Sequence, residues 1–255
     1  MMHLIDSHCH LDFQLFDFDR VAILSRCQKL GIKDIIVPGV TADRWQNLID
    51  ICSGSESLHP ALGLHPLFMA DHKAEHLEQL KNLIDSSQPV AIGEIGLDFY
   101  LPNHDKQAQI DLFIEQLKLA QSAQLPVLLH VRKAHDKTIS LLRKYPLISG
   151  IVHAFNGSLQ QAEQYQKLGF LLGVGGAITH LKATRLRHLF SQLPLSAIVL
   201  ETDAPDMPLA EMKQHSNTPE NIPFILSSLA SLRPESCQNI ATITTNNLKK
   251  ILKIR

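Results

Sequence analysis

Short apolar segments recur along the whole chain, each bounded by Gly, Pro or polar residues. Several are rich in β-branched residues, and none is as long as a typical helix. Continuous apolar runs of this kind are typical of strands that are buried on both faces of a parallel sheet. The segments cover residues 4–5, 34–38, 61–64, 90–94, 127–130, 150–153, 170–174 and 197–201. The pattern therefore predicts eight buried strands.

Amphipathic helical patterns separate these strands. Apolar residues spaced i, i+3, i+4 and i+7 occur within residues 110–117, and similar spacing occurs within 77–84 and 222–229. A further helix is expected over residues 235–252. Gly31 follows the end of one of these patterns, as glycine does at helix carboxyl ends.

The alternation of the two patterns predicts the fold class. Consecutive strands are about 28 residues apart, which is the length of one βα unit. Eight such units without interruption favour a closed barrel over an open doubly wound sheet. No composition shift marks a domain boundary. We therefore expect an α/β protein with a single (β/α)₈ TIM-barrel domain over residues 1–255.

Composition narrows the possible functions. The 24 Lys and Arg and 25 Asp and Glu residues leave a formal net charge of −1. This excludes a protein that coats duplex DNA by charge alone, but it allows a nuclease with a local cationic groove. No apolar run approaches the roughly 20 residues needed to cross a bilayer.

The four cysteines are far apart and lack CxxC spacing, which predicts reduced thiols and a cytoplasmic location. Cys9 is expected to be a core thiol. We also expect a monomer with no membrane association and no obligate protein partner.

Metal-binding residue types stand at the predicted carboxyl ends of five strands. TIM-barrel enzymes keep their active sites at that rim. Two of the residues are two positions apart and therefore share one face of a strand. The set comprises His8, His10, Glu94, His130, His153 and Asp203. Four imidazoles and two carboxylates suit Zn²⁺, Mn²⁺, Co²⁺ or Ni²⁺ and, with added waters, Mg²⁺.

The size of this set indicates two divalent cations rather than one. Six ligands exceed one tetrahedral site and match two ions about 3.5–4 Å apart that share a carboxylate. Glu94 is expected to be the bridge, because its strand lies between the two groups of ligands. One ion would be completed by His8, His10 and Asp203. The other would be completed by His130 and His153. A single histidine at a strand end is more often structural, but five strands that supply such residues to one rim favour a metal site.

The chain resembles the TatD family of metal-dependent hydrolases, within the amidohydrolase-like barrels. The matching segments are 5–12 (IDSHCHLD), 63–66 (GLHP), 93–98 (GEIGLD), 125–130 (LPVLLH), 153–158 (HAFNGS) and 200–205 (LETDAP). They span the chain in the family's order. The resemblance implies a TIM barrel that binds two divalent cations through the six residues above. It also implies a deoxyribonuclease, commonly a 3′-to-5′ exonuclease.

One segment departs from the family pattern. Many members carry a basic stretch after the segment that ends at residue 205, whereas residues 206–209 here read Asp-Met-Pro-Leu. This is more like the YjjV-type subgroup, and it weakens the expectation of DNA binding but not that of metal chemistry. Lys182, Arg185, Arg187 and His188 share a helical stretch, which we expect to be a solvated outer face rather than a contact with nucleic acid.

The expected chemistry is metal-assisted hydrolysis. A divalent cation lowers the pKa of a bound water toward about 7. Asp203 would act as general base, and Glu94 would complete the catalytic pair. His65 and Arg132 are candidate contacts for a substrate phosphate, although a loop contact or a surface charge would explain them equally well. Asp98 could orient a ligand histidine.

Four functions remain open at this point. The first is a phosphodiesterase that acts on single-stranded or 3′-ended DNA. The others are a small-molecule amide or phosphoester hydrolase, an aminoacyl-tRNA esterase and a non-catalytic metal-binding protein. Glu94, at a position where related hydrolases often carry a modified lysine, favours the first function. The sparse basic residues favour the second. The complete ligand set argues against the last.

Overall fold

Eight parallel strands form one sheet, and each strand is hydrogen-bonded to the next in chain order. The computed structural model describes residues 2–100, 105–146, 149–212 and 216–254. The strands are β1 (Leu4–Asp6), β2 (Ile32–Pro38), β3 (Leu58–Leu62), β4 (Ala91–Asp98), β5 (Val127–Arg132), β6 (Gly150–Val152), β7 (Phe170–Val174) and β8 (Ile198–Leu200).

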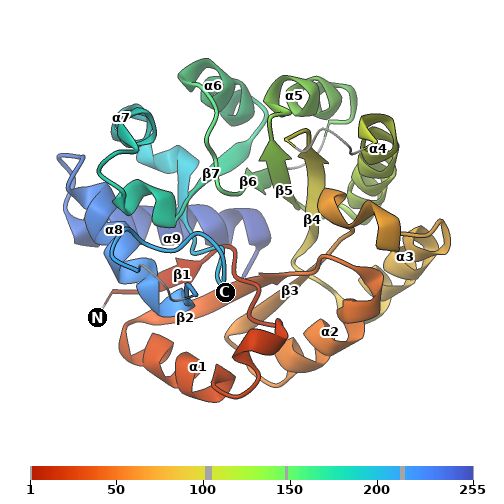
Figure 1. Ribbon diagram of the computed structural model, residues 1–255, viewed down its shortest axis with the longest axis horizontal. Helices are drawn as coiled ribbons and strands as arrows, with labels where there is room; N and C mark the ends of the chain where they lie inside the picture. Colours follow the sequence, from red (N-terminus) through yellow and green to blue (C-terminus); the bar gives the residue numbers. More distant parts are fainter. Residues whose placement is uncertain (1, 101–104, 147–148, 213–215, 255) are drawn as a thin grey trace.

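Backbone hydrogen bonds between the two ends of the sheet nearly close it into a barrel. The N–H of Ser7 donates to the carbonyl of Leu200 at 2.9 Å, just beyond β1. The N–H of Asp203 donates to the carbonyl of His8 at 2.8 Å. Figure 1 shows the strands as a ring with helices around it. The predicted (β/α)₈ TIM-barrel fold is confirmed.

The helices cover the outside of the ring (Figure 1). They are α1 (Arg20–Lys29), α2 (Trp45–Ser53), α3 (Glu75–Ser87), α4 (Lys106–Ala123), α5 (His135–Lys144), α6 (Leu159–Lys167), α7 (Thr184–Gln192), α8 (Ile222–Ala230) and α9 (Cys237–Leu252). Short 3₁₀ turns include η3 (Pro66–Asp71) after β3 and η4 (Gly176–Thr179) after β7. None of the helices in these described ranges combines the length and apolar character that a membrane crossing requires.

Helix α9, expected over residues 235–252, has side chains that reach the interior of the barrel. Its Leu248 and Leu252 join one buried cluster with Ile5, Ile36 and Leu128 of the strands. Apolar burial of this kind contributes roughly 25 cal/mol per Å² of area removed from water. The barrel interior is therefore a packed core.

Strand β4 is longer than the sequence predicts. The predicted strand ends at Glu94, whereas β4 continues to Asp98, so that boundary is wrong. Ile95 and Leu97 are fully buried and pair with Leu129 and Val131 of β5. A charged residue usually ends a buried run, but the Glu94 carboxylate lies among buried histidines, and the strand continues past it.

Other strand ends differ by a few residues. The strands β1, β6 and β8 end at Asp6, Val152 and Leu200. The predicted metal ligands from these strands therefore lie in the segments just after them. Strand β3 covers Leu58–Leu62 rather than 61–64, because its residues from Leu58 onward already pair with β2.

Glycine and charge placement agree with the predicted helix ends. Gly31 has a φ of 85°, the left-handed conformation that glycine adopts most easily after a helix. Lys249 and Lys250 stand in the last turn of α9, where positive charge interacts favourably with the helix dipole.

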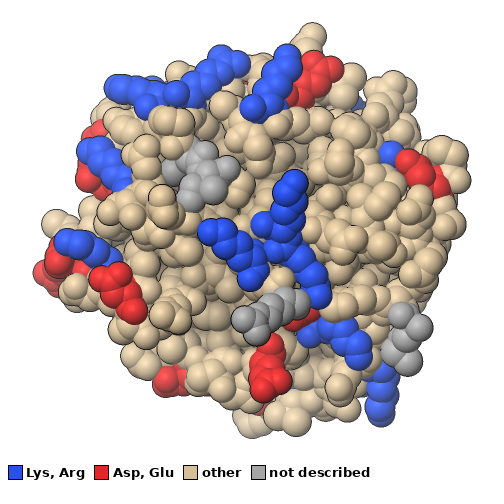
Figure 2. All heavy atoms as spheres, turned by 180° about the vertical axis from the view of Figure 1, so that it is seen from behind, with Lys and Arg blue, Asp and Glu red and all other residues tan. Residues whose placement is uncertain are grey.

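Seen from behind, the molecule carries a group of Lys and Arg side chains near the centre of that face (Figure 2).

Candidate metal centre

The six predicted ligands come together at one end of the barrel. The structure brings their donor atoms into overlapping groups, within each of which all atoms lie within 4.8 Å of one another. The groups are His8, Glu94 and His153; His8, His10 and Asp203; and His65, Glu94 and His130. His65, which was expected only as a substrate contact, is thus part of the same cluster.

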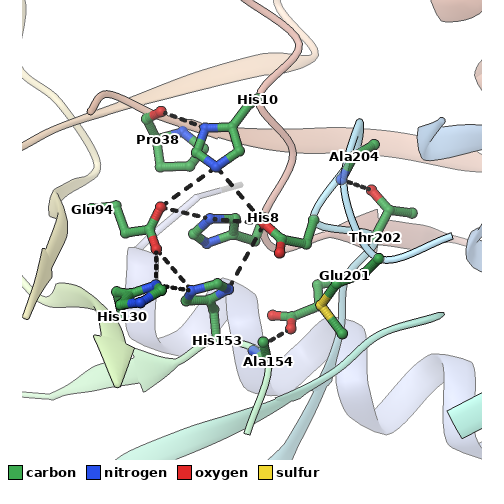
Figure 3. Close-up of polar contacts among 12 residues, drawn as sticks. His8, His10, Pro38, Glu94, His130, His153, Ala154, Glu201, Thr202 and Ala204 are labelled. Atoms are coloured by element: carbon green, nitrogen blue, oxygen red, sulfur yellow. Dashed lines mark hydrogen bonds and ion pairs between the residues drawn. The ribbon is translucent and has the colours of Figure 1, made fainter. Parts of the chain in front are cut away.

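Glu94 lies at the centre of the cluster, and its two oxygens face different histidines (Figure 3). Oε2 lies 3.2 Å from Nε2 of His8 and 3.5 Å from Nε2 of His10. Oε1 lies 3.1 Å from Nδ1 of His130 and 2.7 Å from Nε2 of His153. We refer to His8 and His10 as the first pair and to His130 and His153 as the second pair.

Asp203 lies on the side of the first pair. Its Oδ1 is 3.6 Å from Nε2 of His8 and 3.7 Å from Nε2 of His10. The same oxygen is 3.9 Å from Nδ1 of His153. Burial raises the pKa of Asp203 to about 7, helped by the charge of Glu94 and opposed by His153. The predicted grouping of Asp203 with the first pair matches its position.

Two hydrogen bonds fix which ring nitrogen faces the cluster. Nδ1 of His10 donates to the carbonyl of Pro38 at 3.2 Å. Nε2 of His130 donates to Oδ2 of Asp98 at 2.9 Å, so the expected contact of Asp98 with a histidine is present. In each ring the other nitrogen then offers a lone pair to the cluster, as in metal-binding histidines generally.

The hydrogen bonds of His65 indicate a donor rather than a ligand. Its Nδ1 accepts from the N–H of Leu67 at 3.1 Å. Burial lowers the pKa of His65, which favours the neutral ring. A neutral ring that accepts at Nδ1 carries its proton on Nε2. That atom lies 3.2 Å from Oε1 of Glu94 and is placed to donate.

Asp6 is a positioning residue that the sequence pattern does not reveal. Its Oδ1 accepts from the N–H of His8 at 3.1 Å and from the N–H of Thr202 at 2.9 Å. Its Oδ2 accepts from the hydroxyl of Thr202 at 2.5 Å. Asp6 therefore ties the segment that carries the first pair to the segment that carries Asp203.

The two histidine pairs differ in their affinity for protons. Burial lowers the pKa of His8 to about 3 and that of His10 to about 4. Burial also opposes protonation of His153, but the charges of Glu94 and Asp203 outweigh it and raise its pKa to about 10. Hydrogen bonds to carboxylates likewise outweigh burial and raise the pKa of His130.

The donor set fits divalent cations. The contacts of the Glu94 oxygens and of Asp203 Oδ1 with ring nitrogens span 2.7 to 3.9 Å. Ligand atoms at about 2.0–2.2 Å from one ion are separated by roughly 3.0–3.5 Å, and the contacts of Glu94 with His8, His10 and His130 have this spacing. Nδ1 of His8 and Nδ1 of His153 are buried without a hydrogen-bond partner among the described residues. The residues present can therefore hold metal without rearrangement of the barrel.

A small pocket with apolar walls lies against the cluster, between His10 of the first pair and both histidines of the second pair. Its volume is about 160 Å³, and Phe13, Val40, Leu67 and Phe68 line it beside the cluster. The Phe13 ring stacks on the ring of His10, with 4.8 Å between centroids. We refer to this hollow as the apolar pocket.

A larger cleft borders the second pair. Its volume is about 520 Å³, and its lining includes Arg132, Lys182 and Arg185. The guanidinium of Arg132 lies 3.7 Å from the centroid of the Tyr100 ring and outside the ligand cluster. We refer to this hollow as the basic cleft.

Two of the basic residues expected on a solvated face near α7 are exposed, and they also border a hollow at the barrel mouth. These are Lys182 and Arg185, which line the basic cleft. The turn η4 and the start of α7 lie against this side of the barrel mouth. Arg185 donates to the carbonyl of Asn156 at 2.7 Å, which places its side chain at the cleft.

The whole barrel matches a known family. Residues 5–253 match the family described as TatD related DNase. The chain belongs to this family. The resemblance inferred from the sequence motifs is therefore confirmed.

Relatives within the TatD-related DNase family extend over nearly the whole chain. A protein of Escherichia coli K12 named uncharacterized metal-dependent hydrolase YjjV is 40% identical over 253 residues, covering 98% of each chain. An uncharacterized metal-dependent hydrolase of Haemophilus influenzae is 34% identical over 260 residues, covering 98% of this chain and 99% of the relative. The crystal structure of the Escherichia coli K12 YjjV, described as a TatD homologue, superposes with a TM-score of 0.95 at 39% identity and covers 99% of this chain and 98% of that one.

The chain is thus a metal-dependent hydrolase of the TatD family with a candidate metal site at the barrel mouth.

Proposed function

We propose that this protein is a phosphodiesterase that uses two divalent cations to cleave DNA from a 3′ end. The observation that carries the proposal is the position of Glu94, whose two oxygens face separate histidine pairs beside a basic cleft. A carboxylate shared in this way is typical of two-metal hydrolases. The family description as a TatD related DNase supports nucleic acid as the substrate.

The first ion would be held by His8, His10, Asp203 and one oxygen of Glu94. The second would be held by His130, His153 and the other oxygen of Glu94. Bound there, divalent cations supply Lewis acidity and an acidified water for attack at phosphorus.

The chain's own groups supply the proton transfer and the orientation. Asp203 is placed to accept the proton of the attacking water, because its carboxylate faces the cluster beside the first pair. Nε2–H of His65 donates to a phosphoryl oxygen and stabilises the charge that develops there. Arg132 binds phosphate through its fork of N–H groups. Lys182 and Arg185 attract the anionic strand into the cleft.

The two hollows would hold different parts of the substrate: the terminal nucleotide and the rest of the strand. The apolar pocket has room for one ring, with Phe68 available for stacking. Its described lining residues include no Lys or Arg, so a phosphate that follows the ring would lie unpaired. The basic cleft accommodates a charged chain. This division favours removal of a terminal unit.

The test uses protein stripped of metal and reloaded separately with Mg²⁺, Mn²⁺ and Zn²⁺. A 5′-labelled single strand and a small phosphomonoester are followed in parallel. The proposal expects a metal-dependent ladder that shortens from the 3′ end. Turnover of the phosphomonoester with the strand left intact would instead identify a small-molecule phosphoester hydrolase.

A further inference from the structure

A second basic pocket lies beside the basic cleft. Its volume is about 410 Å³, and it lies between the segment after β5, the start of α5 and the segment after β6. It shares Asn156 and Arg185 with the basic cleft. A ligand that leaves the metal centre across Arg185 therefore enters this pocket directly.

Positive charge predominates in this second pocket. Lys133, Lys137 and Arg185 line it, against one carboxylate, that of Asp136. Asp136 accepts a hydrogen bond from the amide of Gln161 at 2.7 Å. Across the described residues, no carboxylate oxygen lies within 4.0 Å of the ammonium groups of Lys133 and Lys137. In a chain with a net charge of −1, this local excess of cations favours an anion.

Arg185 is held between the two hollows. Its guanidinium donates to the carbonyl of Asn156 at 2.7 Å and to that of Gly157 at 3.3 Å. These bonds use two of its five N–H groups, and no carboxylate among the described residues forms an ion pair with the guanidinium. A cation fixed in this way loses less side-chain freedom when it binds a phosphate.

Lys133 adopts a backbone conformation that few residues tolerate. Its φ is 56°, in the left-handed region that favours Gly, Asn and Asp. The residue lies in the short turn between β5 and α5. Asparagine can replace lysine here without added backbone strain, which provides a way to remove the charge and keep the turn.

We propose that this second pocket binds another phosphate of the substrate strand, one or two nucleotides from the scissile bond, through Lys133, Lys137 and Arg185. The inference rests on the proposed function, because a polynucleotide carries phosphates at regular intervals. A small phosphodiester ends inside the basic cleft and does not reach the second pocket.

The first test measures binding without cleavage. The double substitution Lys133→Asn with Lys137→Gln is compared with a matched control, Lys29→Gln with Lys167→Gln. The control removes the same charge at the carboxyl ends of α1 and α6. Both are made in an Asp203→Asn background, and binding of a labelled single strand is followed by fluorescence anisotropy.

The double substitution is expected to raise the Kd about tenfold, whereas the control leaves it unchanged. The slope of log Kd against log salt is expected to fall by about 0.7 for each phosphate that the variant no longer neutralises. Equal thermal denaturation of the variants shows that the fold is intact. If the double variant does not fold, the single substitution Lys137→Gln gives the same test with one lysine removed.

The second test measures turnover in protein that keeps Asp203. Three substrates are compared: a long single strand, a dinucleotide and bis(p-nitrophenyl) phosphate. The inference expects kcat/KM of the double variant to fall about tenfold for the long strand and to keep its value for the other two.

The outcomes separate the two proposals. If the wild type cleaves the long strand and the double variant behaves like its control, the second pocket is not a phosphate site and the proposed function stands. If the wild type hydrolyses the small diester but neither cleaves nor binds any strand, the proposed function and this inference are both wrong.

Discussion

The two histidine pairs that face Glu94 have different surroundings. In the first pair, burial keeps the pKa values of His8 and His10 at about 3 and 4. The second pair borders the basic cleft, and nearby carboxylates raise the pKa values of His130 and His153. Both pairs share one carboxylate, yet nearby charges favour protonation only in the second pair, most strongly at His153.

This difference indicates that the two proposed metal positions are not equivalent. Metal binds only the unprotonated imidazole, so an ion at the first pair displaces no proton from His8 or His10 near neutral pH. Asp203 would also hold the first ion, and with its pKa of about 7 it gives up a proton only when the pH is near or below 7. An ion at the second pair must displace the proton of His153, whose pKa is about 10. We therefore expect the first position to fill first and the second to exchange more readily.

Removal of the general base should have the largest effect. Asp203→Asn is expected to lower kcat by about 10³-fold, because general-base catalysis typically contributes about 10²–10⁴-fold. Metal content, measured by mass spectrometry of the loaded protein, shows whether the ions remain. Asp206→Asn, which lines the apolar pocket nearby, is the control. Turnover above a tenth of wild type with both ions bound would show that Asp203 is not the base.

A substitution at Asp98 should weaken metal binding at the second position alone. Asp98→Asn replaces the charged partner of His130 and is expected to lower affinity for the second ion about 10–100-fold. The first ion should bind as before. Asp136→Asn, an exposed change beside the second pocket, is the control. Equal weakening of both ions in a calorimetric titration would contradict the division into two positions.

The pH dependence of loading follows from the same comparison. A histidine with a raised pKa is protonated below that pKa, so affinity at the second pair should fall as pH falls. Between pH 8 and pH 6 we expect about a tenfold loss per pH unit for each proton displaced. The imidazoles of the first pair stay neutral in this range, so at the first position only Asp203, with a pKa of about 7, adds a smaller pH dependence. Titrations in two buffers of different ionisation enthalpy count the protons released, and no release on filling the second position would refute the assignment.

A substitution in the apolar pocket should have a smaller effect, and this effect should be on the KM. Phe68→Ala removes a stacking surface and is expected to raise the KM for a single strand about fivefold to tenfold, since stacking on an aromatic side chain contributes about 1–3 kcal/mol per base. Leu181→Ala, an exposed residue outside the two hollows, is the control. Steady-state kinetics that show no change would mean that the terminal ring does not occupy this pocket.

Much of the architecture could be predicted because it depends on local pattern. Apolar runs and helical spacing predict the alternating units, and their regular separation predicts the closed barrel. The position of Glu94 could not be placed correctly along its strand. A buried carboxylate usually ends a strand, and only the surrounding histidines, which come from distant segments, stabilise its charge inside the barrel mouth.

The clustering of the six candidate ligands could be predicted, but the lining of the basic cleft could not. The candidate ligands lie in or just after the strands at one end of the barrel, so topology brings them together. Lys182 and Arg185 belong to a segment whose orientation depends on how η4 and α7 pack against the barrel. The second pocket combines Lys133 and Lys137 with Arg185, about 50 residues further along the chain, and no spacing rule connects them.

Turnover as a function of bound metal tests the central claim most directly. Metal-free protein is titrated with Mn²⁺ at pH 8, and cleavage of a 3′-ended single strand is measured at each equivalent. The account predicts little cleavage up to one equivalent and a steep rise between one and two. Full activity at one equivalent, or none at two or more, would contradict a hydrolase in which Glu94 joins two ions.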